Sequence, residues 1–203
     1  MAVLEALTGT GLAASAGLNA YIPLLSMGLL ARYTNLIDLP AGWQWLSDGW
    51  ALTILAVLLA IEVVADKVPV VDHINDVVQS FVRPAAGGLA FGAGSSAQTI
   101  TVSDPEQFVD SGQWVPIAIG VVIALAVHAL KAASRALINA TTAGVGAPVA
   151  STVEDAASAM MSLVAILLPV LVLVALAGLL LWLWRLVRRR RARKAAARNA
   201  PVG

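Results

Sequence analysis

The sequence predicts an all-α protein, a polytopic bundle of about five membrane-spanning helices. Of its 203 residues, 59% are hydrophobic and only 12% are charged, whereas soluble domains carry about 25% charged residues. Long apolar segments alternate with short polar ones, and about 20 apolar residues are enough to cross the hydrocarbon core of a bilayer. The chain has no cysteine, which excludes a disulfide framework, a thiolate metal site and a cysteine nucleophile.

The five predicted spans are residues 9–30, 51–65, 83–102, 114–130 and 151–184. In the first, Asn19 is the only strongly polar residue near the middle, and Arg32-Tyr33 closes the segment with an interfacial pair. The second carries Glu62. The third is rich in glycine and alanine, which allow close contact with a neighbouring helix. The fourth begins at Trp114.

The fifth span, residues 151–184, is longer than one crossing and contains Pro169, a position where a helix can kink. Between the second and third spans, residues 70–82 have apolar side chains at helical spacing, with charged and polar ones on the other face. This pattern predicts an amphipathic helix that is interfacial or re-entrant. Residues 136–153 could hold a further crossing, and the sequence leaves that question open.

A shift of 64 residues aligns the second span with the fourth without a gap. The matching positions are Trp50 with Trp114, Lys67 with Lys131, Ile74-Asn75 with Ile138-Asn139, and Pro84 with Pro148. Because these residues are polar or conformationally special, their shared register predicts a parallel two-span repeat, with units at about 50–102 and 114–184.

Positive charge is concentrated at the carboxyl end. Eight of the 13 Lys and Arg residues lie between Arg185 and Arg198, and all 12 acidic residues precede them. We therefore expect a membrane domain at 1–184 and a disordered basic tail at 185–203, which stays cytoplasmic because Lys and Arg set orientation. The expected location is the cell membrane (a bacterial inner membrane), with the run Arg188–Lys194 on anionic lipid headgroups. No nucleic-acid partner is expected.

Four strings of residues resemble one known family. They are Ala16-Gly-Leu-Asn19-Ala-Tyr-Ile-Pro23, Val64-Ala-Asp66-Lys67-Val-Pro69 with Asp72, Arg83-Pro84-Ala-Ala-Gly87, and Ser151-Thr-Val-Glu154-Asp155. Together they are similar to a family of small prokaryotic integral membrane proteins known as domain of unknown function four thousand one hundred and twenty-six. The resemblance covers roughly residues 5–178 and departs at Ala147, where the family has Asn. It implies a multi-span membrane protein and no particular activity.

Ionisable residues beside the apolar spans are the candidate site. Such groups are costly at membrane depth and usually face a cavity or a partner. Glu62 and Asp66 are four residues apart and share a helix face, and Asp72 and Asp76 repeat this spacing. The candidate residues for an ion or solute site are Asn19, Glu62, Asp66, Lys67, Asp72, Asp76, Arg83, Glu154 and Asp155.

Several interpretations of these residues remain open. Lys67 and Arg83 could neutralise the carboxylates and only fix the fold; the cluster could form a hydrated cation or proton pathway; or its oxygens could bind Mg²⁺ or Ca²⁺. Glu154 and Asp155 could cap the fifth helix, or they could face a cavity and pair with Lys131 or Arg135. Asn19 could bond a neighbouring helix or contact a solute.

The sequence favours a small permease or channel for an ion or small solute. The alternative is a non-transporting membrane protein, for assembly or lipid organisation, whose charges are structural. No catalytic arrangement of serine, histidine and aspartate and no phosphate loop is visible, so we expect neither an enzyme nor a cofactor. Five spans enclose little space, so we expect a homo-oligomer.

Overall fold

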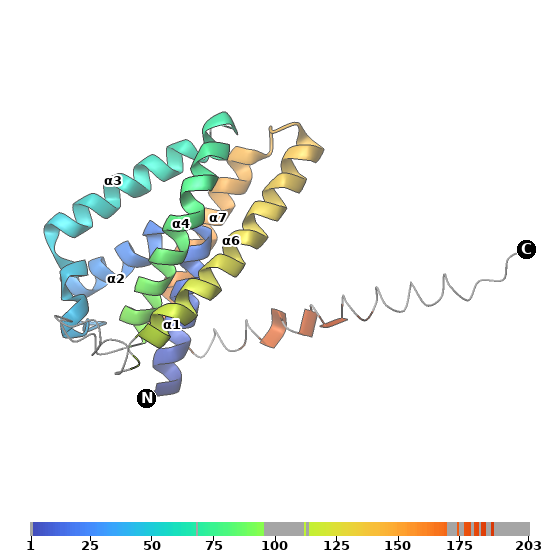
Figure 1. Ribbon diagram of the computed structural model, residues 1–203. Helices are drawn as coiled ribbons and strands as arrows, with labels where there is room; N and C mark the ends of the chain where they lie inside the picture. Colours follow the sequence, from blue (N-terminus) through green and yellow to red (C-terminus); the bar gives the residue numbers. More distant parts are fainter. Residues whose placement is uncertain are drawn as a thin grey trace, which may run out of the picture.

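The structure, a computed structural model, is all-helical over the part of the chain that it describes. That part comprises residues 2–67, 69–95, 112, 114–169, 174, 177–179, 181–182, 184–185 and 188, and the side chains of residues 2 and 69–74 lie outside it. The elements are α1 (Ala2–Leu18), α2 (Tyr21–Tyr33), a 3-10 helix η1 (Ala41–Ser47), α3 (Gly49–Ala65), α4 (Pro69–Gly94), α6 (Trp114–Thr142) and α7 (Ala147–Leu167). Figure 1 shows α4 and α6 side by side and α3 at the edge of the bundle.

The first predicted span is two helices instead of one. The helix is interrupted at Asn19-Ala20. There the Asn19 Oδ1 accepts hydrogen bonds from the backbone N–H groups of Tyr21 (3.1 Å) and Ile22 (3.2 Å). A continuous helix would pair the Asn19 carbonyl with the N–H of residue 23. Because that residue is proline and has no N–H, the break costs little backbone hydrogen bonding.

The predicted amphipathic helix and the third span form a single helix, α4. Pro84 lies inside it and does not start a new element. Helix-interior proline is tolerated in membrane proteins because neighbouring groups satisfy the freed backbone carbonyl. Residues 96–102 of the predicted span lie outside the described part.

The last two helices also differ from the prediction. Residues 136–153 hold no separate crossing: they form the end of α6, a turn at 143–146 and the start of α7. The α7 helix ends at Leu167, Leu168 is not helical, and the positions that the structure describes between Pro169 and Arg188 are helical again. The predicted kink at Pro169 is therefore confirmed as a break in the helix, because proline restricts the residue before it and has no N–H to donate.

The core is made largely of alanine and a few larger residues. Its buried members are Leu12, Ala16, Ala20, Leu24, Met27, Trp43, Leu46, Leu55, Ala86, Ala90, Ala93, Ala124 and Ala165. Small side chains let helix backbones approach closely, which is how helices associate in lipid. Glycines do the same between α4 and α6: a Cβ added at Gly87 would lie 2.8 Å from the Gly120 carbonyl oxygen.

Hydroxyl groups join α1 to α7. The Oγ of Ser15 lies 2.8 Å from that of Ser158 and 2.7 Å from that of Ser162. All three side chains are fully buried. Serine hydroxyls commonly link helices in this way inside membranes.

The molecule exposes apolar side chains and buries charged ones, as expected for a protein surrounded by lipid. Val122, Leu125 and Leu130 of α6 are exposed, while Lys131 and Arg135 on the same helix are buried. Within the described residues, α6 and α7 are long and apolar enough to cross a membrane, and η1 with α3, bent by 61°, could be a third crossing.

The predicted number of five spans is not confirmed, and neither is the internal repeat. Under the 64-residue shift, the end of α3 at Ala65 corresponds to residue 129, where α6 continues unbroken to Thr142. The two repeat units therefore remain a prediction, as does the division into domains.

We predict that Gly120→Ala destabilises the protein although alanine favours helices. Alanine gains about 1 kcal/mol in helix propensity, but overpacking against Gly87 and Phe91 costs about 1–3 kcal/mol. The melting temperature in detergent should fall. Gly178→Ala is the control, because nothing lies within 4 Å of an added Cβ there. Equal melting temperatures for the two variants would contradict the close α4–α6 contact.

Candidate functional site

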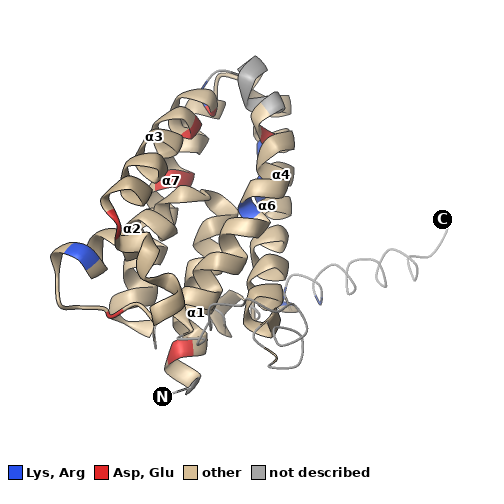
Figure 2. Ribbon diagram, turned by 60° about the vertical axis from the view of Figure 1, so that its left-hand side comes forward, with Lys and Arg blue, Asp and Glu red and all other residues tan. Residues whose placement is uncertain are grey.

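Six charged residues from four parts of the chain meet inside the bundle. This charge cluster consists of Glu62, Asp66, Arg83, Lys131, Arg135 and Glu154. The first five are at most 3% exposed, and the Glu154 side chain is 13% exposed. Three carboxylates balance three cations. The cations belong to α4 and α6, and the carboxylates to α7 and the end of α3; Figure 2 shows acidic positions on α3 and α7 and a basic one on α6.

Asp66 is the centre of the cluster. Its Oδ2 lies 3.3 Å from the Lys131 Nζ, 3.2 Å from an Arg135 nitrogen and 3.8 Å from an Arg83 nitrogen. Its Oδ1 accepts a 2.7 Å hydrogen bond from the Asn75 Nδ2. Both oxygens of this buried carboxylate are therefore held by donors from α4 and α6, the condition for keeping a charge buried.

Arg83 connects Asp66 to a second set of contacts. One of its terminal nitrogens donates a 2.9 Å hydrogen bond to Glu62, and the other lies 3.1 Å from the His128 Nδ1. Because a guanidinium can only donate, Nδ1 accepts, and in a neutral imidazole Nε2 then carries the hydrogen. That nitrogen lies 3.1 Å from the Ser80 Oγ, which can accept its hydrogen bond.

Lys131 ties the cluster to the break between α1 and α2. Its Nζ donates a 2.8 Å hydrogen bond to the Leu18 carbonyl, at the end of α1, and lies 3.2 Å from Glu154. The carbonyl end of a helix carries partial negative charge, which a cation stabilises. Across the same break, the Asn19 Nδ2 donates a 2.9 Å hydrogen bond to Asp155. The helix break and the charge cluster are therefore parts of one site.

The structure brings most, but not all, of the predicted site residues together. Glu62, Asp66, Arg83 and Glu154 meet in the cluster, and Asn19 and Asp155 pair beside it. Of the two cations that could neutralise the carboxylates, Arg83 pairs with them, whereas Lys67 forms no ion pair with a described residue. Its Nζ binds the Val63 carbonyl at 3.1 Å, where it completes the last turn of α3.

Two further predicted residues do not enter the cluster. Asp76 lies on α4 with a partly exposed side chain, and among the described residues it forms no ion pair. The side chain of Asp72 lies outside the described part.

The capping interpretation of Glu154 and Asp155 is wrong. The α7 helix begins at Ala147, so both residues lie about two turns inside it and cannot cap its start. Of the other interpretation, only the pairing is observed: the Glu154 Oε2 lies 2.6 Å from an Arg135 nitrogen and 3.2 Å from the Lys131 Nζ. The prediction started the fifth helix at Ser151 because a stretch of small residues precedes it. The structure places this stretch at the end of α6, in the loop at 143–146 and in the first residues of α7.

Sequence reasoning did not place Lys131, Arg135 and His128 among the site residues. The signal was present, because His128, Lys131 and Arg135 are spaced by three and four residues in an otherwise apolar helix and so share one face. All three are buried. Ending the fourth span at residue 130 hid this polar stripe, since the last two residues then fell in a loop.

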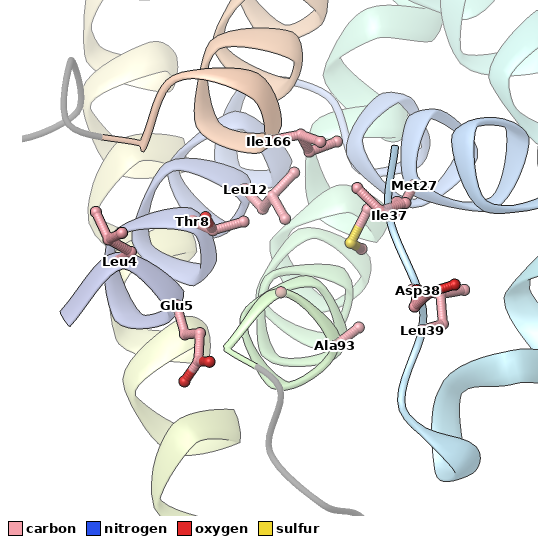
Figure 3. Close-up of a pocket in the computed structure, with 11 residues that line it drawn as sticks. Leu4, Glu5, Thr8, Leu12, Met27, Ile37, Asp38, Leu39, Ala93 and Ile166 are labelled. Atoms are coloured by element: carbon pink, nitrogen blue, oxygen red, sulfur yellow. The ribbon is translucent and has the colours of Figure 1, made fainter. Parts of the chain in front are cut away.

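A cavity of about 240 Å³ lies near the start of α1, apart from the cluster. Figure 3 shows Leu4, Glu5, Thr8 and Leu12 of α1 on one side, with Ile37, Asp38 and Leu39 on the other. Thr8 and Leu18 are ten residues apart along α1, or about 15 Å. The cavity and the charge cluster are therefore separate features.

The described residues contain no group of three or more His, Asp or Glu side chains arranged to hold a metal ion. Within the cluster each carboxylate already faces a cation. Two buried polar atoms of the cluster, the Glu62 Oε2 and the Arg83 Nε, have no hydrogen-bond partner. The chemistry of the site is thus that of paired charges with some hydrogen-bonding capacity unused.

We predict that Lys131→Met strongly destabilises the protein, while Lys67→Met does not. Removing one member of a buried ionic set leaves an uncompensated charge, which costs about 3–5 kcal/mol. Lys67 is partly exposed and bonds only a carbonyl, so its loss should cost about 0.5 kcal/mol or less. Unfolding free energies of both variants in mixed micelles test this, and equal losses would show that Lys131 is not held by its carboxylates.

One family model matches the chain. It is described as Domain of unknown function (DUF4126) and spans residues 6–189, which include every residue of the charge cluster. No curated protein and no solved structure gives a significant match. Because the match covers most of the chain, the protein belongs to this family.

Proposed function

We propose that the protein is a small membrane permease or channel for an ion or small solute, and that the charge cluster is its site. The observation that carries this proposal is the balanced set of six charges, five of them buried, beside the break between α1 and α2. It is a proposal about transport and includes no catalysed reaction.

Energetics support a functional role for the cluster. Moving charges out of water is costly, and well-packed apolar residues often replace buried ion pairs without loss of stability. A chain that needed only stability could use leucine and alanine here, as it does elsewhere in its core. Charged residues kept inside membrane helices commonly mark solute, ion or proton pathways.

The helix break supports the same proposal. Transporters commonly bind their solutes where helices are interrupted, because free helix ends offer partial charges and unpaired backbone groups. Here the end of α1 already binds the Lys131 ammonium through the Leu18 carbonyl. The start of α2 is capped by Asn19, whose amide also reaches Asp155. A charged solute would meet this same set of groups.

The arrangement also supports a mechanism. The cations on α4 and α6 close against the carboxylates of α3 and α7, so separating these pairs would open a polar path. Each broken pair must be replaced by contacts with the solute or with water, which links opening to solute binding. A homo-oligomer, which we propose as well, would enclose more space than one chain.

We predict measurable flux in proteoliposomes that depends on the cluster. The panel should contain protons, potassium, chloride, acetate and phosphate. The double variant Asp66→Asn with Lys131→Met removes one carboxylate and one cation and keeps the cluster balanced, so it should fold. It should lower flux about tenfold or more, the effect of about 1.4 kcal/mol on a barrier.

The matched control is Lys67→Met, which removes a lysine outside the cluster and should keep the wild-type flux. If wild-type protein gives no flux above empty liposomes for any solute in the panel, transport of these solutes is contradicted. If the folded double variant transports as well as wild type, the cluster is not the site.

The second candidate is a non-transporting membrane protein for assembly or lipid organisation. The observation that favours it is the pairing itself, because every carboxylate of the cluster has a cation partner. This candidate predicts that the balanced double variant loses stability while wild-type and variant liposomes are equally tight.

A further inference from the structure

We propose that Arg83, Lys131 and Arg135 form a binding site for a small anion with a carboxylate or phosphate group, and that Asp66 occupies this site in the present conformation. This inference rests on the proposed function and names the class of solute: an anion, not a cation.

The first argument is the convergence of donors on one carboxylate. Three cationic groups approach the same oxygen, Asp66 Oδ2, at 3.2, 3.3 and 3.8 Å. The Asn75 amide holds the other oxygen. Two guanidinium groups, an ammonium and an amide are the donor types with which proteins bind carboxylates and phosphates. A free carboxylate in the place of Asp66 would find the same four donors.

The second argument is that the four donors and the acceptor, Asp66, belong to different helices or helix ends. All four donors belong to α4 and α6, which are in close contact through Gly87 and Gly120. The donor set therefore sits on one rigid pair of helices. Asp66 follows the last residue of α3, which lies at the edge of the bundle (Figure 1).

The carboxyl-terminal half of α3 is attached mainly through its charges. We call residues 56–65 the α3 arm. Its only buried residue is Glu62, and Asp66 follows directly. Val57, Ile61 and Val64 of the arm are more than half exposed. In lipid, these apolar side chains gain nothing from docking on protein, because acyl chains are equally apolar. The ion pairs of Glu62 and Asp66 are thus the main contacts that hold the arm.

The third argument is the charge balance. Without Asp66 the cluster has three cations against two carboxylates, and without both the arm and Asp66 it has three cations against Glu154 alone. An anion restores the balance in both cases, whereas an added cation would meet three like charges. The Arg83 Nε, fully buried and without a partner, offers a further N–H donor to an incoming anion.

The test replaces the internal carboxylate with a free one. Asp66→Gly removes a side chain that differs from acetate by one hydrogen, so acetate should refill the site. The purified full-length variant in detergent should melt at a lower temperature than wild type. Acetate, and more weakly phosphate, should restore most of this loss in a saturable manner, because a ligand that binds only the folded state stabilises it. Neutral acetamide should not.

Three controls make the result specific. Wild type should show no saturable acetate effect, because Asp66 already fills the site. Asp38→Gly removes an exposed carboxylate and should also give none. Adding Lys131→Met to Asp66→Gly balances the remaining charges, two against two, and should abolish the acetate effect while the protein stays folded.

A second measurement applies if Asp66→Gly does not fold. Asp66→Ala favours helical backbone and leaves the place of the carboxylate empty, and saturation-transfer NMR with ¹³C-acetate should detect binding to it that Lys131→Met removes. Absence of saturable acetate and phosphate binding in both Asp66 variants would overturn the inference. Restoration by phosphatidylglycerol but not by free anions would also overturn it, since the site would then bind a lipid headgroup.

Binding and flux separate this inference from the proposed function. Saturable acetate binding by the variants, with no flux by wild type, would leave the anion site standing and contradict transport. Flux of potassium or protons through wild type, with no anion binding by either variant, would support transport and contradict the anion site.

Discussion

The carboxylate of Asp66, held by cations from two neighbouring helices, is the contact on which the rest of the site depends. It lies between the Arg83–Glu62 pair and the pairs that Lys131 and Arg135 make with Glu154. Loss of this one carboxylate would leave three cations facing only two carboxylates, Glu62 and Glu154. In a low-dielectric interior such repulsion is far stronger than in water. The helices α3, α4, α6 and α7 therefore have to be arranged around this point.

A second constraint comes from lipid itself. Because acyl chains compete with apolar side chains, helices in a bilayer associate through small residues, hydroxyls and charges. Each of these appears at a different contact here: glycine between α4 and α6, serine between α1 and α7, and ion pairs between α3 and its neighbours. Of the three kinds of contact, only the ion pairs join charged groups, and these are the contacts on which our transport proposal rests.

The sequence predicted the helical class, the charged candidates and the family, because these follow from composition, from isolated ionisable residues and from short strings. It did not predict the break at Asn19, although Pro23 four residues later was the signal. It named Lys131 and Arg135 only as possible partners of Glu154 and Asp155 and not as partners of Asp66, because hydropathy marked the end of the span before them. Hydropathy measures how apolar a segment is, whereas a helix continues as long as its backbone is paired. The partners of Asp66, 65 and 69 residues away in the chain, had no local signal.

The order of the charges along the chain has a consequence for biosynthesis. Arg83 is synthesised only 21 residues after its partner Glu62, whereas Lys131 is synthesised 65 residues after its partner Asp66. At ribosomal rates of about 5–20 residues per second, this second delay is about 3–13 seconds. During that interval Asp66 can pair only with Asn75 and Arg83 of α4, because its two partners on α6 are not yet made. Helix α6 is synthesised later and must pack beside Asp66. The assembly of the domain is complete when Lys131 and Arg135 of α6 pair with this carboxylate.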